Sequence, residues 1–374
     1  MSPQTTPSTA SNQHHPNTHT SSRSSTSATI FLASVVALLA AAAIAVFFGN
    51  EDTAGLFGLR RFLGGGVASS RSSSILRQTS PAVQGFSSSA LATDEVKMRT
   101  PVYFLSHGGP NVMYQVDHPA YKRLGQIGRE ITTKVKPRAV VVFSAHWQAS
   151  QDTIQVNTAE ITDLIYDFYG FPSHYYKEKY PNVGSAEVAK KVLDALGAAG
   201  IKAEGVKRGL DHGVWASFKC AFEPDENPLN VPIVQVSLFK TEDPVQHYRL
   251  GQAVSHLRDD NILIIASGMA VHNLRDMMFS FGDPRPLPYT ASFDEALKDA
   301  VTSVPEHREK AMAELLKRPD ARQAHPYFDH LLPIHIGAGA AGEDRAKRLW
   351  TLGEGSMSWA QYRFGEVANS SSSL

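Results

Sequence analysis

The sequence predicts an α/β fold with a central, largely parallel sheet flanked by helices. Short apolar runs rich in β-branched residues recur along the chain, and segments with helical periodicity lie between them. Several runs are apolar on consecutive positions, as strands covered on both faces must be. The expected strands are residues 101–105, 139–145, 153–156, 231–238 and 261–268.

The segment 185–200 (SAEVAKKVLDALGAAG) shows the helical pattern between two such strands. Ser185 is suited to cap the helix N-terminus, and Glu187 places a negative charge in the first turn. Gly200 is suited to end the helix. We therefore expect a folded domain over residues 98–374, built as one unit or as two closely joined lobes.

Residues 1–97 differ in composition from the rest and form a leader. Residues 1–28 are of low complexity, which predicts disorder. Residues 30–48 (IFLASVVALLAAAAIAVFF) carry no charge and would be about 28 Å long as a helix, against a hydrocarbon core of roughly 30 Å. They predict a transmembrane helix, with a cleaved signal peptide as the alternative.

The targeting signals of this leader conflict. Residues 55–93 are rich in arginine and serine and contain no acidic residue, which is typical of a transit peptide. Arginines after the hydrophobic helix outnumber the one that closely precedes it, so the folded domain of a membrane-anchored protein would face the cytosol. A cytoplasmic or mitochondrial location is the alternative.

Composition limits the chemistry that is available. The chain has 36 basic and 36 acidic residues, and this balance argues against nucleic acid as a partner. Cys220 is the single cysteine, so neither an intrachain disulfide nor a thiolate zinc site can form, and a reducing compartment is expected. Any metal ion must bind to histidine, aspartate or glutamate.

Three histidines stand at or just beyond the ends of expected strands. His107 follows the first strand, His146 follows the second, and His272 follows the run NILIIASG. Ligands of parallel α/β sheets collect outside the carboxyl ends of the strands. Small residues next to each histidine leave room around its ring. The sequence therefore predicts an imidazole-rich site at this edge of the sheet.

Four further histidines come from two later segments. His212 lies in GLDHGVW, and residues 324–343 contain His325, His330 and His335. His325 precedes a proline and is expected to start a helix, since proline is tolerated in the first helical turn. His330 and His335 each lie five residues further on, about 140° around a helix per step, so the three cannot all face one ion.

Six motifs in order resemble the class III extradiol ring-cleaving dioxygenases, in the branch around 4,5-DOPA dioxygenase. They are SHGGP, SAHW, YDFYGFPSHYYKEKYP, GLDHGVW, SGMAVHNLR and AHPYFDHLLPIHIGAGAAGE. The resemblance covers nearly all of residues 100–365 and leaves the leader outside. It implies an oxidoreductase of aromatic compound metabolism, which uses a metal ion and O2 to open the ring of a DOPA-like catechol.

The same resemblance implies roles for particular histidines. His107, His146 and His325 are expected to bind the metal, with His325 in the place that a carboxylate occupies in many non-haem iron sites. His272 is expected to act as the acid/base group or as a fourth metal ligand. His212 is expected to hydrogen-bond the substrate hydroxyl or bound oxygen.

Three further residues are expected to contact the substrate. Gly108 and Gly109 would let the substrate ring approach the backbone beside His107. Arg275 would pair with a substrate carboxylate, with a structural salt bridge as the alternative. The resemblance implies non-haem Fe(II) for catalysis, because zinc has no redox chemistry, and Zn(II) as a substituting ion.

Two other functions remain open from the residues. A metal-dependent hydrolase could use the same histidines with zinc-bound hydroxide as the nucleophile. A signalling scaffold could share the fold without ring cleavage. The presence of His212 and His272 beside all the metal candidates favours the dioxygenase.

Overall fold

The computed structural model describes residues 98–280 and 283–367. Their main sheet has eight strands in the order β4-β3-β5-β2-β6-β1-β11-β8. All five strands expected from the sequence are confirmed to within about two residues at each start and three at each end. The strands of this sheet are β1 (Val102–Ser106), β2 (Ala139–Gln148), β3 (Thr153–Asn157), β4 (Lys202–Val206), β5 (Ile233–Leu238), β6 (Ile262–Gly268), β8 (Ala346–Trp350) and β11 (Gln361–Phe364).

The centre of the sheet is parallel, as expected. Strands β5, β2, β6 and β1 run side by side in one direction. β11 and β8 extend the sheet by antiparallel pairing, and β3 pairs antiparallel with β5 and parallel with β4. A second sheet joins β7 (Val271–His272), β10 (Met357–Ser358) and β9 (Gly353–Glu354). The three strands of the second sheet are too short to stand out as apolar runs. The same holds for three strands of the main sheet, because β4 and β8 are partly exposed and β11 has only four residues.

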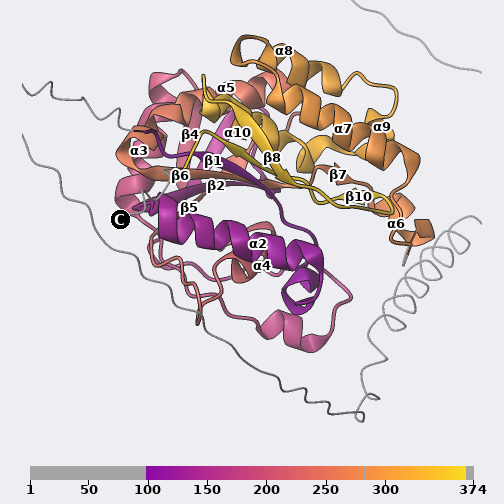
Figure 1. Ribbon diagram of the computed structural model, residues 1–374. Helices are drawn as coiled ribbons and strands as arrows, with labels where there is room; N and C mark the ends of the chain where they lie inside the picture. Colours follow the sequence, from indigo (N-terminus) through magenta and orange to yellow (C-terminus); the bar gives the residue numbers. More distant parts are fainter. Residues whose placement is uncertain (1–97, 281–282, 368–374) are drawn as a thin grey trace, which may run out of the picture. The chain divides into compact units, whose positions relative to one another are not determined.

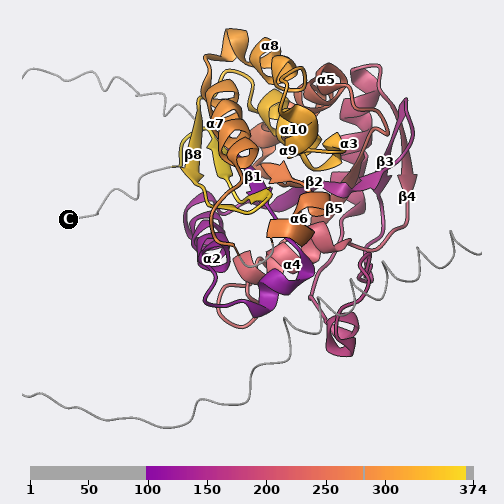
Figure 2. The same ribbon diagram turned by 90° about the vertical axis from the view of Figure 1, so that its right-hand side faces the viewer.

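Helices cover both faces of the main sheet (Figures 1 and 2). Helices α2 and α4 pack on one face, whereas α3, α5, α7, α8, α9 and α10 lie on the other. This is the three-layer arrangement expected of a buried parallel sheet. The α-helices are α2 (Pro119–Glu130), α3 (Ala186–Ala198), α4 (His212–Ala221), α5 (Pro244–Val254), α6 (Leu274–Ser280), α7 (Pro288–Thr302), α8 (Pro305–Leu315), α9 (Ala321–Ala324) and α10 (Leu332–Ala341).

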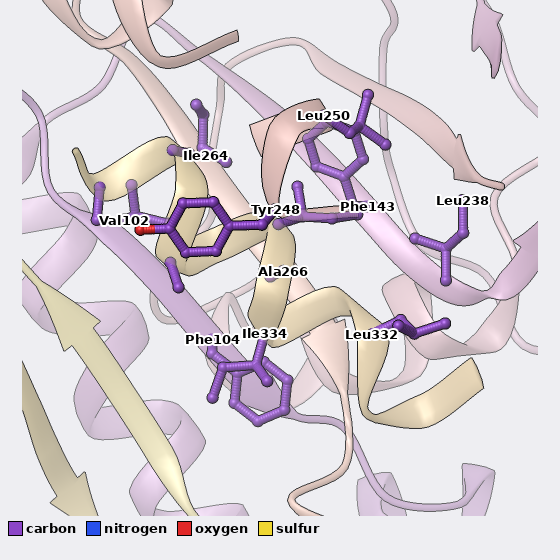
Figure 3. Close-up of a cluster of buried hydrophobic side chains, with 14 of the residues drawn as sticks. Val102, Phe104, Phe143, Leu238, Tyr248, Leu250, Ile264, Ala266, Leu332 and Ile334 are labelled. Carbon is purple, nitrogen blue, oxygen red and sulfur yellow. The ribbon is translucent and has the colours of Figure 1, made fainter. Parts of the chain in front are cut away.

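The larger part of the core lies between the sheet and helices α5 and α10 (Figure 3). Phe104 of β1 and Ile264 of β6 are fully buried there, as are Leu250 of α5 and Ile334 of α10. A fully buried aliphatic side chain of this kind stabilises the fold by roughly 1.5–3 kcal/mol. This packing holds the strands rigidly, and so holds the residues that follow their carboxyl ends.

The predicted ends of helix α3 are confirmed. The Ser185 hydroxyl accepts a hydrogen bond from the backbone N–H of Val188 at 3.2 Å. Gly200 has a φ of +73°, a left-handed conformation that glycine adopts without steric cost.

The predicted start of a helix at His325 is wrong. Helix α9 ends at Ala324, and His325 caps it in an extended conformation with φ −139° and ψ 94°. A residue that precedes proline is restricted to such backbone angles, so His325-Pro326 ends one helix rather than opening the next.

The predicted transmembrane helix and membrane-anchored location are corrected. Within residues 98–280 and 283–367, the structure has no helix that is both long and apolar enough to cross a bilayer. The sequence segment on which the prediction was based, residues 30–48, lies outside the described residues, as does the rest of the leader up to residue 97.

Candidate metal centre

A group of polar side chains lies at the carboxyl ends of three neighbouring strands of the main sheet. His107 directly follows β1, His146 lies near the end of β2, and Ser267 lies near the end of β6 between them. The His107 backbone N–H donates to Gly268 O at 2.9 Å, which extends the β1–β6 pairing up to the histidine. The sheet itself therefore sets the spacing of the two imidazoles.

A third imidazole joins this pair from a later segment. His330 ends the 3-10 helix η5 (Phe328–His330), and its carbonyl accepts a hydrogen bond from Met269 N at 2.9 Å. The Nε2 atom of His146 lies 3.2 Å from Nε2 of His107 and 3.2 Å from Nε2 of His330. Nitrogen atoms of His107, His146 and His330 thus converge on one point, and we call these three residues the edge histidines.

The hydrogen bonds of Nδ1 determine which ring nitrogens carry protons. The Ser267 hydroxyl donates a hydrogen bond to Gly213 O, and its oxygen lies 2.9 Å from Nδ1 of His107. Because its one proton is already used, this oxygen must accept a hydrogen bond from the Nδ1–H of His107. Nδ1 of His146 lies 3.0 Å from an oxygen of Asp167. In the neutral rings Nε2 of both histidines then bears a lone pair.

His212 and His272 complete the group. The Nδ1 atom of His212 lies 2.9 Å from Asp167 Oδ1, and its ring centroid lies 4.1 Å from that of His146. His272, in β7, stacks on His330 with ring centroids 3.7 Å apart and planes 11° apart. Five imidazoles are therefore packed together at one edge of the sheet.

Burial dominates the electrostatics of these rings. It holds the pKa values of His107, His330 and His272 well below the ordinary value of histidine, and the neighbouring imidazoles lower them further. Burial would lower the pKa of His146 as well, but its hydrogen bond to Asp167 and the nearby carboxylates raise it overall.

A cavity of about 610 Å³ opens beside these rings. His146, His272 and His330 line its inner part, and Arg275 and Tyr327 line it as exposed residues. A cavity of this size can enclose a small aromatic molecule.

Gly213 in α4 has no room for a side chain. A Cβ atom there would lie 2.7 Å from Cδ2 of His146 and 2.8 Å from Oγ of Ser144. Glycine in the motif GLDHGVW therefore lets α4 approach the imidazoles closely, and its carbonyl accepts the Ser267 hydroxyl proton.

A family model described as the catalytic LigB subunit of aromatic ring-opening dioxygenase matches residues 100–364, which include every residue of this site. The chain belongs to this family of dioxygenases. It is an extradiol aromatic ring-opening dioxygenase and metal-dependent. The hydrolase and scaffold alternatives are thereby set aside.

Curated relatives agree with this assignment, and a solved structure shares the fold. The dioxygenase is 37% identical over 270 residues to a 4,5-DOPA dioxygenase extradiol of Beta vulgaris, covering 70% of this chain and 95% of the relative. It is 32% identical over 243 residues to a protein of the same name from Escherichia coli, covering 65% and 85%. The crystal structure of an uncharacterized Escherichia coli protein has 27% identity and a TM-score of 0.58, covering 71% of this chain and all of that one.

The residues present fit a metal ion. Nε2 of His107 and Nε2 of His146 both bear lone pairs, so their separation of 3.2 Å cannot be a hydrogen bond between them. Two nitrogens bound to one ion at about 2.1 Å, at angles near 90–109°, lie about 3.0–3.4 Å apart. The edge histidines are thus spaced as adjacent ligands of one ion.

The structure does not bring His325 into this group, although it was expected to bind the metal. Its Nε2 lies 3.0 Å from Ala270 O, and its ring packs against Phe293 and Phe328. His330, five residues further on, lies beside His107 and His146 in its place. His325 and His330 belong to the same motif, and the turn at η5 places His330, rather than His325, beside the other two imidazoles.

The structure assigns a different reason to the first of the two glycines after His107. Gly108 has a φ of +67°, and a Cβ atom there would lie 2.1 Å from the Trp359 ring. A Cβ at Gly109 would lie 2.7 Å from the Asn111 amide oxygen. Neither glycine is among the residues that line the cavity described above. The left-handed backbone and the nearby Trp359 ring are the reasons that position 108 requires glycine.

Arg275 lies in the cavity wall, where a substrate contact was expected. Its guanidinium lies 5.4 Å from the Tyr327 ring centroid and donates to the Tyr327 hydroxyl at 3.4 Å. Among the described residues it has no carboxylate within 4.0 Å, so the alternative of a structural salt bridge is not observed.

Sequence reasoning missed Asp167, whose carboxylate contacts both His146 and His212. Asp167 lies near the start of the motif YDFYGFPSHYYKEKYP, which is otherwise rich in aromatic residues. A carboxylate is the usual partner for the outer nitrogen of a metal-bound histidine, so the acidic residues of the motif could have been examined for this role.

Proposed function

We propose that this dioxygenase uses Fe(II), bound by His107, His146 and His330, to open the ring of a catechol that carries a carboxylate. The convergence of three Nε2 atoms supports this proposal, as does the neighbouring cavity, whose Arg275 has no carboxylate partner among the described residues. The relatives named 4,5-DOPA dioxygenase extradiol support a DOPA-like substrate.

Iron is proposed on chemical grounds. Bound Fe(II) would supply open coordination positions for both catechol oxygens and dioxygen together with redox chemistry, whereas zinc has no redox chemistry. An imidazole-rich site also suits zinc, so Zn(II) is proposed as an ion that occupies the site without supporting turnover.

His272 and His212 are proposed to interact with the hydroxyl groups of the catechol. Burial keeps His272 neutral near pH 7, and this side chain lines the cavity. The His212 Nδ1–H is held by Asp167, which leaves its Nε2 free to accept a hydrogen bond. We assign proton acceptance to His272 and hydrogen bonding of the substrate or oxygen to His212.

Arg275 is proposed to bind the substrate carboxylate at the outer end of the cavity. A guanidinium pairs with a carboxylate through two parallel hydrogen bonds, which orients the substrate as well as binding it. Tyr327 would hold the guanidinium in place through the contact described above.

Oxygen uptake tests the proposed function. The full-length protein is loaded anaerobically with Fe(II) or with Zn(II) and then mixed in air with DOPA, dopamine or a mono-phenol. We expect oxygen uptake and a yellow ring-opened product with the catechols in the iron-loaded protein alone. Equal turnover with zinc, or no oxygen uptake with any catechol, would overturn the proposal.

The substitution Arg275→Met tests whether this arginine binds the substrate carboxylate. The KM for DOPA should rise about tenfold, while the KM for dopamine, which lacks a carboxylate, should stay within about twofold. An equal rise for both substrates would remove Arg275 from carboxylate binding.

A further inference from the structure

Asp167 lies between a proposed metal ligand and the proposed hydrogen-bonding histidine. Its Oδ2 lies 3.0 Å from Nδ1 of His146. Its Oδ1 accepts hydrogen bonds from Nδ1 of His212 at 2.9 Å and from the backbone N–H of His212 at 3.0 Å. One carboxylate therefore contacts two imidazoles, and each ring contacts a different carboxylate oxygen.

The carboxylate can only accept hydrogen bonds in this arrangement. Burial alone would raise the pKa of Asp167, but its hydrogen bonds to His146 and His212 lower it well below the ordinary range. Both rings must then carry a proton on Nδ1, and each neutral ring presents an unprotonated Nε2 to the site.

The segment around Asp167 is held firmly against helix α4. Ile165 N donates to Leu210 O at 2.7 Å, and Leu210 N donates to Asp163 O at 2.9 Å. The Trp215 indole N–H donates to Ile165 O at 3.0 Å. The contacts fix the backbone on which the carboxylate stands.

The next residue contacts His212 from the other side. The Phe168 ring is 6% exposed and packs edge-on against the His212 ring, with centroids 5.5 Å apart and planes at 88°. His212 is thus confined between an aromatic ring and a carboxylate contributed by consecutive residues.

We propose that Asp167 is a positioning residue that couples metal binding by His146 to the orientation of His212. This inference rests on the proposed metal site. Through one oxygen it keeps Nε2 of His146 free for the metal, and through the other it fixes the His212 ring. Loss of the contact with His146 then weakens metal binding, and loss of the contact with His212 frees the His212 ring. Loss of both contacts has both effects.

Two substitutions separate these contacts. Asp167→Asn offers one accepting oxygen and one donating NH2 group. Because two hydrogen bonds converge on Oδ1 and one on Oδ2, the amide oxygen should take the place of Oδ1. The NH2 group then faces His146, which must move its proton to Nε2 and lose its ligand lone pair. Asp167→Ala removes both contacts.

The first measurement is the zinc affinity of the full-length protein, by competition with a chromophoric chelator. Loss of an outer hydrogen bond to a metal-bound histidine typically weakens binding about 10–100-fold. We expect a loss of at least about tenfold for both Asp167 variants. Asp163→Asn is the matched control, since Asp163 is exposed in the same segment, and its affinity should stay within about threefold of wild type.

The second measurement is the 15N NMR spectrum of the histidine rings in the diamagnetic zinc-loaded protein, with His212→Ala to assign the signals. The His212 ring should show a protonated Nδ1 in wild type and in Asp167→Asn, and should lose this fixed form in Asp167→Ala. A purely structural aspartate would lower the melting temperature without changing either readout.

Each outcome bears on the inference. Zinc affinity of Asp167→Asn within threefold of the Asp163→Asn control, or an unchanged His212 signal in Asp167→Ala, would overturn it. If Asp167→Ala does not fold, the Asp167→Asn affinity and spectrum still decide. A wild type that binds zinc but never consumes oxygen with a catechol would overturn the proposed function and leave this inference standing.

Discussion

Two groups of histidines in this dioxygenase have opposite surroundings. The edge histidines His107, His146 and His330 direct Nε2 at one another. His325 and His335, which we call the core histidines, direct Nε2 at backbone carbonyls, Ala270 O at 3.0 Å and Met312 O at 3.1 Å. A neutral ring satisfies such a carbonyl by donating its proton, so no lone pair remains for a metal on that nitrogen.

The comparison indicates that burial and a lowered pKa are too common among these histidines to single out a candidate metal ligand. His325, His330 and His335 are all nearly or fully buried, and burial lowers the pKa of each. What separates them is whether Nε2 faces another unprotonated nitrogen or a carbonyl oxygen. The following predictions test this distinction, beginning with the largest expected effect.

His330→Ala and His325→Ala compare the two groups directly. Four-ligand zinc sites bind with roughly 10–16 kcal/mol, so removal of one imidazole should weaken metal binding about 1000-fold or more. We expect this loss for His330→Ala, whereas His325→Ala should keep its metal and lose about 1–3 kcal/mol of unfolding free energy. Mass-spectrometric metal analysis and urea unfolding measure the two effects. Full metal loss in His325→Ala alone would restore His325 as the ligand.

Acid sensitivity is expected from the core histidine His335. Burial lowers its pKa to about 4, below the usual 6.5, so the unfolded chain binds the proton more readily. The contribution of His335 to the free energy of unfolding is therefore fully present above pH 6.5. It is lost as the pH falls from 6.5 to 4, and it amounts to about 3 kcal/mol.

The substitution His335→Gln tests this pH dependence, because an amide can still donate to Met312 O but does not titrate. Urea unfolding of the chelator-treated protein between pH 7 and pH 4 should show a shallower decline for the variant than for wild type. His307→Gln, at an exposed position of α8, is the matched control and should follow wild type. Parallel curves for all three proteins would contradict the prediction.

His272→Gln tests a ring that stacks on an edge histidine without joining the converging nitrogens. At a pH where the wild type is fully metallated, catechol affinity should stay within about tenfold, or about 1.4 kcal/mol, of wild type. The ring-opening rate should fall by about 100-fold, the usual scale for losing a general acid/base group. A rate within a few-fold of wild type would transfer proton acceptance to His212. Metal loss as complete as in His330→Ala would make His272 a ligand.

Ser267→Ala should have the smallest effect, about a tenfold loss of metal affinity. Without the hydroxyl, His107 has no acceptor for its Nδ1–H, and the ring can place its proton on the ligand nitrogen instead. Ser217→Ala is the control, since Ser217 is equally buried but hydrogen-bonds only backbone carbonyls within α4. Equal metal affinity in the two variants would remove Ser267 from this role.

Much of the site could be predicted because it follows strand ends. The apolar runs of β1 and β2 place His107 and His146 at the same edge, since the two strands run parallel to β6 between them. His272 and His212 were expected near that edge and lie there. The antiparallel strands β8 and β11 were missed because they are short and their pattern is mixed.

By itself, the sequence determined the central parallel sheet, the exclusion of a thiolate metal site within one chain, and the motifs of a ring-opening dioxygenase. Apolar periodicity and residue type are local properties, so they can be read along the chain. Only the tertiary structure shows that His330, rather than His325, lies beside His107 and His146, and only it brings Asp167 to His146 and His212. These contacts depend on how η5 and the 163–168 segment pack over β6 and α4, and no local pattern records which nitrogen a buried ring turns toward its neighbours.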